Sequence, residues 1–236
     1  MPQPYKLLII GGGLAAVSAL DILAQQKAAA NSAILSAEPH LPYDRPPLSK
    51  DYLLGQTPRE EVFLKPESFY KENGIEVFIN TRAAKLDTTH RTVTAEDGRS
   101  FAFENLMIAA GSELHRLRIP GHALEGIYYL RQINDSEAIQ SAVKVAKQAV
   151  IVGAGFIGLE VAAAFQQMGI AVTVLEAGHT VFPRLATPEL SDFFLRYYQG
   201  KGVKFVFQDK IEAFEGEKHL KDVRTASGLR IPCDVA

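Results

Sequence analysis

The sequence predicts an α/β protein that contains two βαβ units. Two short apolar runs each end at a cluster of glycines, and a stretch of helical composition follows each cluster. A further apolar run comes after each of these stretches. Because strand, glycine turn, helix and strand recur in this order, we expect two Rossmann-like nucleotide-binding layers, each with a parallel sheet.

The first unit lies at the start of the chain. Residues Tyr5–Ile10 form an apolar run of strand length that three consecutive glycines end. Residues 14–26 are rich in Ala and Leu, which favours a helix, and residues 32–37 are predicted as the second strand. The apolar run over residues 7–20 is shorter than the roughly 20 residues of a membrane-spanning helix, so neither a span nor a secretory leader is expected.

The second unit repeats this order later in the chain. Residues Gln148–Val152 form the apolar strand, and residues 153–158 are rich in glycine. Residues 159–168 have helical composition, and residues 171–175 are the second strand.

The other elements are predicted from local signals. Pro46 and Pro47 are expected to hold Arg45 in an extended conformation, and Asp97-Gly98 predicts a hairpin turn. The remaining predicted elements are helices over 68–73, 135–146 (capped by Asn134 or Asp135) and 188–199 (capped by Thr187), strands over 75–79, 83–87, 92–95, 100–103, 105–110, 203–207, 221–225 and 229–231, and the start of a strand over 233–236.

Composition and charge exclude several classes of protein. Of the 236 residues, 47% are hydrophobic and 22% charged, which excludes collagen-like, coiled-coil and mostly disordered chains. A net charge of −2 gives no reason to expect a nucleic acid or an anionic membrane as partner. The single cysteine, Cys233, excludes a disulfide framework and fits a reducing, cytoplasmic compartment, and no metal site is predicted.

The two glycine clusters fit the loops that bind dinucleotides. One matches G-x-G-x-x-A and the other G-x-G-x-x-G, and each follows a predicted strand and opens a predicted helix. The first glycine allows the tight turn, the second lets the backbone approach a pyrophosphate, and the third small residue lets the helix pack on the strand. The alternative is that these glycines only mark strand–helix turns. The matching positions are Gly11, Gly13 and Ala16 in one loop and Gly153, Gly155 and Gly158 in the other.

Each loop is followed by an acid at the end of the next strand. Glu38 comes 27 residues after Gly11, and Glu176 comes 23 residues after Gly153. An acid at about this spacing accepts hydrogen bonds from ribose hydroxyls. Glu176 would also repel a 2′-phosphate, and no Lys or Arg lies between it and Arg184, so the sequence predicts NADH rather than NADPH.

Five segments carry a resemblance to a known family. They are PYDRPPLSK (42–50), LMIAAGS (106–112), IPG (119–121), YYLRQINDSEAI (128–139) and VIVGAGFIGLEVAAAF (150–165). With these segments the whole chain resembles the FAD-dependent NADH:ferredoxin reductases of oxygenase systems, including the rubredoxin and putidaredoxin types. The resemblance implies an FAD domain into which an NAD domain is inserted, with electrons passing from NADH through FAD to a ferredoxin or rubredoxin.

The resemblance also implies roles for individual residues. Lys50 would lie beside the isoalloxazine of FAD and Glu160 would pair with it, and these two are the candidate catalytic residues. A fixed ammonium stabilises charge on a reduced flavin. The alternatives, which give these residues no catalytic role, are that Lys50 faces solvent and that Glu160 is an ordinary acid early in a helix. The implied FAD contacts are Gly11, Gly13, Leu14, Ala15, Ala16, Glu38, Arg45, Lys50, Ala83, Ala110 and Gly111, and the implied NADH contacts are Gly153, Gly155, Phe156, Ile157, Gly158, Glu160 and Glu176.

The sequence departs from the family in two respects. His115 and Arg116 stand where the family usually has two arginines, which leaves a carried-over contact of His115 without support. The family also continues beyond residue 236 with a second FAD segment and an interface domain. We therefore expect residues 1–112 to be the first segment of the FAD domain and residues 113–236 an NAD domain that lacks its last strand, and we expect the chain to bind FAD poorly.

Two alternative functions compete with the reductase. A disulfide reductase of the same fold needs a thiol near the flavin, and no cysteine precedes Cys233. A truncated nucleotide-binding fragment without turnover is the other alternative, and retained flavin would separate it from a reductase.

Overall fold

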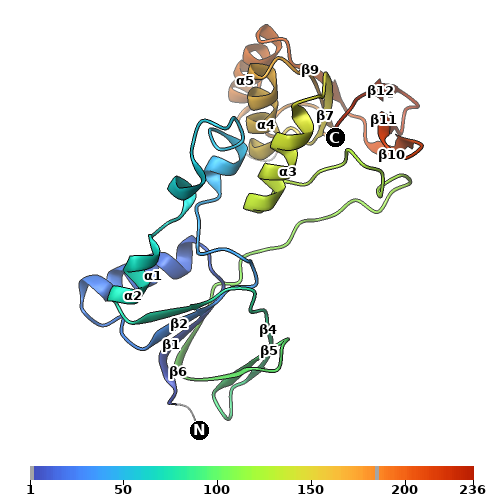
Figure 1. Ribbon diagram of the computed structural model, residues 1–236. Helices are drawn as coiled ribbons and strands as arrows, with labels where there is room; N and C mark the ends of the chain where they lie inside the picture. The colour runs from blue at the N-terminus through green and yellow to red at the C-terminus, as the bar shows by residue number, and fades with distance from the viewer. Residues whose placement is uncertain (1–2, 184–185) are drawn as a thin grey trace. The chain divides into compact units, whose positions relative to one another are not determined.

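The computed structural model describes residues 3–183 and 186–236 (Figure 1). The chain divides into two compact units. Unit 1 comprises Met1–Asp44 and Arg59–Glu113, and unit 2 comprises Arg45–Pro58 and Leu114–Ala236. None of the helices in the described ranges is long and apolar enough to cross a membrane.

Residues 45–58 belong to unit 2, whereas the boundary expected after residue 112 assigns them to the first domain. Hydrogen bonds explain the difference. The hydroxyl of Ser136 donates to the carbonyl oxygen of Leu48 at 2.9 Å, and the hydroxyl of Tyr52 donates to the Glu137 carboxylate at 2.7 Å.

Unit 1 is built on one six-stranded sheet. Four strands are parallel to one another, and the last two continue as an antiparallel meander. In sheet order the strands are β3 (Ile75–Phe78), β2 (Ser32–Leu35), β1 (Tyr5–Ile10), β6 (Ser100–Ile108), β5 (Thr92–Ala95) and β4 (Ala83–Asp87). The helices are α1 (Leu14–Gln25) and α2 (Glu67–Glu72), and a 3₁₀ turn, η2, spans Arg59–Val62.

Alternation along β1 gives the sheet two buried faces. Leu8 packs with Val93 and Phe101 on the face toward the meander, and Ile9 packs with Leu20 of α1 on the face toward the helices. The predicted break within residues 100–110 is wrong. Strand β6 is continuous because its first half pairs with β5 and its second half with β1.

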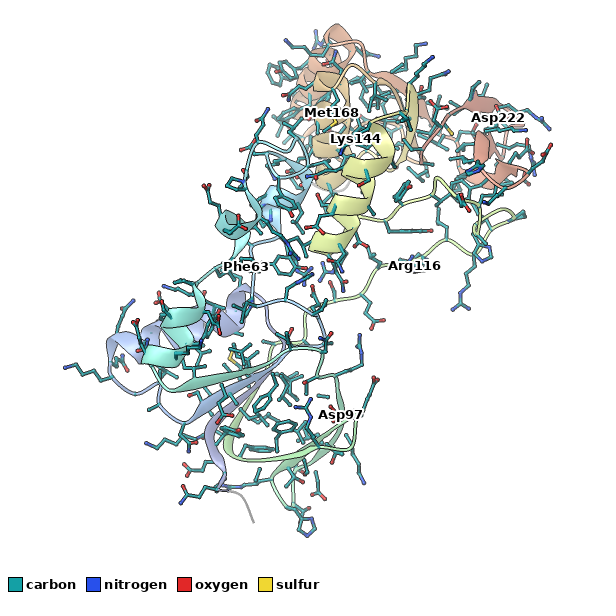
Figure 2. All side chains as sticks on the ribbon, in the orientation of Figure 1. Phe63, Asp97, Arg116, Lys144, Met168 and Asp222 are labelled. Atoms are coloured by element: carbon teal, nitrogen blue, oxygen red, sulfur yellow. The ribbon has the colours of Figure 1, made fainter. Side chains whose placement is uncertain are left out.

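The predicted hairpin turn between β5 and β6 is confirmed. Gly98 has a φ of +87°, which favours glycine, and the Asp97 carboxylate accepts the backbone N–H of Arg99 at 3.0 Å. Asp97 lies at this turn in Figure 2.

Unit 2 contains a three-stranded parallel sheet and a three-stranded antiparallel sheet. The parallel sheet holds β7 (Gln148–Val152), β8 (Ala171–Glu176) and β9 (Lys204–Phe207), connected through α4 (Phe156–Gln167) and α5 (Pro188–Gly200). The antiparallel sheet holds β10 (Ile211–Gly216), β11 (Leu220–Thr225) and β12 (Arg230–Pro232), and α3 (Ile133–Val143) precedes β7. Where the start of a strand was expected, over 233–236, the structure has an isolated parallel bridge between Val235 and Ala149 of β7.

The ends of some elements differ from the prediction. Helix α3 begins at Ile133, because Gln132 is its N-cap and forms a capping box with Asp135. Arg45 is not extended, since its φ of −88° and ψ of −34° are helical. The 3₁₀ turn η1 (Pro46–Ser49) starts from it, and the N–H of Leu48 donates to the Arg45 carbonyl at 3.0 Å. This turn overrides the usual preference of a residue before proline.

Candidate functional site

The glycine loop of unit 1 connects β1 to α1. Gly11 has a φ of +113°, and a Cβ there would lie 2.1 Å from the carbonyl oxygen of Ala109 and 3.0 Å from the Cα of Ala110. A side chain at Gly11 is therefore excluded. A Cβ on Gly13 would meet no atom within 4 Å, while Ala16 is fully buried. The loop thus has one closed end and one open backbone position.

The glycine loop of unit 2 connects β7 to α4 and has the same design. Gly153 has a φ of +110°, and a Cβ on Gly155 would meet no atom within 4 Å. A Cβ on Gly158 would lie 2.1 Å from the carbonyl oxygen of Gly153, so the helix start packs directly on the loop. Gly155 is the position at which a phosphate can approach the backbone.

The helices that follow these loops have free positive ends. Among the described residues, no side chain caps α1 or α4, and neither has an acid in its first turn. In contrast, α5 has Thr187 as cap and Glu189 in its first turn, and α3 has its capping box. The backbone N–H groups at the start of α1 and α4 are therefore available to an anion.

The first turns of these two helices expose apolar side chains. Leu14 is 60% exposed, Phe156 57% and Ile157 55%, and Ala15 is also exposed. Two further predicted FAD contacts lie elsewhere in unit 1, whereas the predicted contacts Arg45 and Lys50 belong to unit 2. Ala83 begins β4 and is half-buried, and Gly111 follows β6 with a φ of +72°. Their roles stay predictions.

Glu176 at the end of β8 is fixed by the backbone. One carboxylate oxygen accepts the N–H of Ala154, in the loop, and the other accepts the N–H of Gly178, each at 2.7 Å. A carboxylate has about four acceptor positions, so two remain for ribose hydroxyls. Arg184, which bounds the stretch without cations, lies outside the described residues.

Glu38 has the corresponding place in unit 1. The Tyr43 hydroxyl donates to its carboxylate, and its own backbone N–H donates to the hydroxyl of Ser36 at 3.3 Å. Tyr43 is buried, so Glu38 is held close to the end of β2.

The predicted proximity of Lys50 and Glu160 is confirmed. Their charged groups, Nζ and Oε2, are 2.8 Å apart, although the residues are far apart in sequence. The pair forms inside unit 2, which contains both residues 45–58 and α4. The Lys50 side chain is 45% exposed, so its ammonium contacts solvent as well as Glu160.

A pocket of about 260 Å³ in unit 2 contains this pair. The Arg45 guanidinium also lines it and donates to the carbonyl oxygen of Arg131 at 2.5 Å. The pocket therefore combines three cationic side chains and one carboxylate with the start of α4. It is lined by Arg45, Pro46, Leu48, Ser49, Lys50, Leu130, Arg131, Phe156, Ile157 and Glu160.

Ser49 is a residue of this pocket that the sequence reasoning missed. Its hydroxyl donates to Oε2 of Glu160 at 2.5 Å, and the residue is buried. A serine inside a proline-rich segment carries no spacing signal. The only available signal is its place within the segment 42–50, next to Lys50.

His115 and Arg116 are not among the residues that line this pocket. His115 lines a second, apolar cavity of about 380 Å³ in unit 2. The Arg116 guanidinium lies over the ring of Tyr129 at 4.9 Å, and the Tyr129 hydroxyl accepts the N–H of Leu117 at 2.9 Å (Figure 2 labels Arg116). Arg116 is thus engaged with an aromatic ring.

Comparisons with known proteins agree with this geometry. The pyridine nucleotide-disulphide oxidoreductase family model matches residues 5–236. The ferredoxin reductase subunit of 5,5'-dehydrodivanillate O-demethylase from Sphingobium sp. is 36% identical over 99% of this chain and 57% of its own length. A rubredoxin–NAD(+) reductase from Pseudomonas putida is 35% identical over 97% of this chain and 60% of its own length.

Solved structures show the same similarity. The ferredoxin reductase for the CYP199A2 system from Rhodopseudomonas palustris matches with a TM-score of 0.93 and 31% identity, over 98% of this chain and 57% of that protein. A covalent putidaredoxin reductase–putidaredoxin complex matches with a TM-score of 0.92 and 26% identity, over 97% of this chain and 56% of that one. The chain thus spans less than two thirds of the length of these relatives.

Proposed function

The chain belongs to the pyridine nucleotide-disulphide oxidoreductase family, and we propose that it passes electrons from NADH through FAD to a small iron–sulfur protein of the ferredoxin or rubredoxin class. The observation that carries the proposal is the duplicated loop design. Each unit has an open glycine position and an uncapped helix start. Each also has an acid at or just after the end of the next strand, Glu38 three residues after β2 and Glu176 at the end of β8. One chain thus offers two dinucleotide sites of the kind that two nucleotide cofactors need.

FAD fits the loop of unit 1. The open face of Gly13 and the free N–H groups at the start of α1 would hold the pyrophosphate, and Glu38 would accept hydrogen bonds from the adenosine ribose. When bound, FAD supplies the conversion of a two-electron hydride into single electrons, which an iron–sulfur cluster requires.

NADH fits the loop of unit 2. Gly155 and the start of α4 would hold its pyrophosphate, and Glu176 would accept the ribose hydroxyls with its two remaining acceptor positions. The same carboxylate repels a 2′-phosphate, so we propose a preference for NADH over NADPH.

Lys50 and Glu160 supply the electrostatics of the pocket. The Lys50 ammonium is a fixed positive charge on the pocket wall, and Glu160 holds it in place at 2.8 Å. A fixed cation stabilises negative charge that develops next to it during reduction. Arg45 adds a second positive charge to the same wall.

The cysteine content of the chain does not support disulfide chemistry. Cys233 is the single cysteine of the chain, and burial, helped by Asp222 and Asp234, raises its pKa to about 12. A thiol in this state is a poor nucleophile. A reducing, cytoplasmic compartment fits this unpaired cysteine, and cell fractionation that placed the protein elsewhere would contradict it.

Steady-state kinetics with the purified protein in a saturating excess of added FAD test the proposal, because we expect the chain to bind FAD poorly. We expect NADH-dependent reduction of a ferredoxin or rubredoxin, with ferricyanide as an acceptor that needs no protein docking. We also expect a higher kcat/KM for NADH than for NADPH. A protein that binds both nucleotides and oxidises no NADH would support the alternative, a nucleotide-binding chain without turnover.

A further inference from the structure

Ser49 holds a carboxylate that already has a cationic partner. Its hydroxyl lies 2.5 Å from Oε2 of Glu160, and the Lys50 ammonium lies 2.8 Å from that same oxygen. We propose that Ser49 is a positioning residue of the reductase, which fixes Glu160 and through it the place of the Lys50 ammonium on the pocket wall. This inference rests on the proposed function for its consequence in catalysis, but its geometric part stands without it.

The competing hydrogen bonds of this group are weaker. The carbonyl oxygen of Pro46 is 3.3 Å from the Ser49 hydroxyl and 3.3 Å from the Lys50 ammonium. A hydroxyl has one proton to donate, and the acceptor at 2.5 Å with a full negative charge takes it. The principal partner of Ser49 is therefore Glu160.

Burial makes the Ser49 contact the more rigid of the two. Ser49 is 4% exposed, whereas the Lys50 side chain is 45% exposed. Water competes with Glu160 for the exposed ammonium, and an exposed ion pair alone holds its geometry weakly. The Ser49 hydroxyl is far less exposed to such competition, although the Glu160 side chain is itself 29% exposed, so the hydroxyl is the donor that orients the carboxylate.

The backbone around Ser49 is itself anchored. Ser49 ends the 3₁₀ turn η1, and the neighbouring Leu48 carbonyl accepts the buried Ser136 hydroxyl of α3 at 2.9 Å. Glu160 lies on α4, one turn after Phe156 and Ile157. The Ser49–Glu160 bond thus fastens η1 to the helix whose start would bind the nucleotide.

Limited acylation of lysines tests the geometric part without any cofactor. The purified chain is treated with a limiting amount of an N-hydroxysuccinimide acetate, and the rate at Lys50 is read by mass spectrometry. In Ser49→Ala we expect the rate at Lys50 to rise about fivefold, the factor that corresponds to the loss of one hydrogen bond. Lys65, which pairs with Asp21 at 2.7 Å in unit 1, is the matched internal control and keeps its rate.

A double-mutant cycle keeps the test independent of folding effects. In Glu160→Gln the rate at Lys50 rises, and adding Ser49→Ala causes no further increase, because both changes remove the same restraint. Ser49→Thr keeps the hydroxyl and is expected to restore the wild-type rate. An unchanged rate at Lys50 in Ser49→Ala, or additive effects of the two substitutions, overturns the proposal.

Kinetics of the FAD-loaded protein test the catalytic part. Ser49→Ala is expected to lower kcat for NADH severalfold while KM stays within twofold, because the nucleotide loop and Glu176 are untouched. An effect on KM alone contradicts the positioning role. If no variant, nor the wild type, oxidises NADH while the acylation result holds, then the proposed function fails and the geometric assignment stands.

Discussion

At the scale of single residues, Glu176 makes the most specific prediction. Glu176→Ala is expected to raise the KM for NADH about tenfold, since a hydrogen bond to a charged group contributes roughly 1.5 kcal/mol. Glu176→Gln keeps the shape of the side chain and removes its charge. We therefore expect it to reduce the ratio of kcat/KM for NADH to that for NADPH by a larger factor than it raises the KM for NADH. Steady-state kinetics with both nucleotides measure this, and an unchanged preference in both variants would rule out a role for Glu176.

Cys233 makes a second prediction at this scale. Burial is the main cause that raises its pKa to about 12, so its reactive thiolate is present only at pH values near or above 12. At pH 8 the native protein should react with a thiol reagent roughly a thousandfold more slowly than the unfolded chain, in which the pKa is about 8.5. A fast native reaction would show that the thiol is accessible.

Single residues also mark the limit of what the sequence predicts. The Lys50–Glu160 pair could be predicted only from the family resemblance. No local sequence pattern indicates that a residue after a 3₁₀ turn and a residue on a distant helix lie close together. For Ser49 the only signal in the sequence is its place next to Lys50 in the segment 42–50. The hydrogen bonds from the backbone N–H groups of Ala154 and Gly178 to Glu176 could not be predicted either. They depend on the position of β8 beside the loop, and the spacing of residues in the sequence does not determine that position.

At the scale of elements, two glycines at the start of α4 have different roles: Gly155 leaves room for the nucleotide, and Gly158 lets the helix pack on the loop. Gly155→Ala places its Cβ in open space at an extended φ of −81°, so stability is expected to change by less than about 1 kcal/mol while NADH binding weakens. Gly158→Ala places its Cβ 2.1 Å from the Gly153 carbonyl oxygen and is expected to destabilise the protein by about 1–3 kcal/mol.

Thermal unfolding and nucleotide titration of the two variants measure both effects. Gly158→Ala serves as the packing control for Gly155→Ala. Equal losses of stability in the two variants, or NADH affinity unchanged in Gly155→Ala, would contradict the division of roles between these glycines.

The elements themselves were largely predictable. Strand length, the glycine clusters and helical composition identified both βαβ units, and Thr187 marks the start of α5 as expected. The start of α3 was missed because Gln132 is an unusual cap. Strand β10 was missed because its register shifts and its two adjacent buried residues, Ala213 and Phe214, break the alternation that predicts a strand.

At the scale of the whole molecule, the two units share the order of strand, glycine loop and helix but differ in their charged residues. Each contains a parallel sheet, an open glycine loop and an acid that follows it, but residues 45–58 bring the Lys50 cation into unit 2. Because we assign FAD to the loop of unit 1 and NADH to the loop of unit 2, the proposed electron path requires that one chain binds both nucleotides. Relatives that the chain matches over 56–60% of their length have names that specify ferredoxin, rubredoxin or putidaredoxin reductases.

Anaerobic mixing of NADH with the protein, reconstituted with added FAD, tests this account most directly. We predict that the long-wavelength absorbance of oxidised flavin bleaches with one equivalent of NADH, that NADPH bleaches it more slowly, and that Lys50→Met slows bleaching while the protein retains its FAD. A protein that holds FAD and NADH together and shows no bleaching would contradict the assignment of an NADH-dependent flavoprotein reductase.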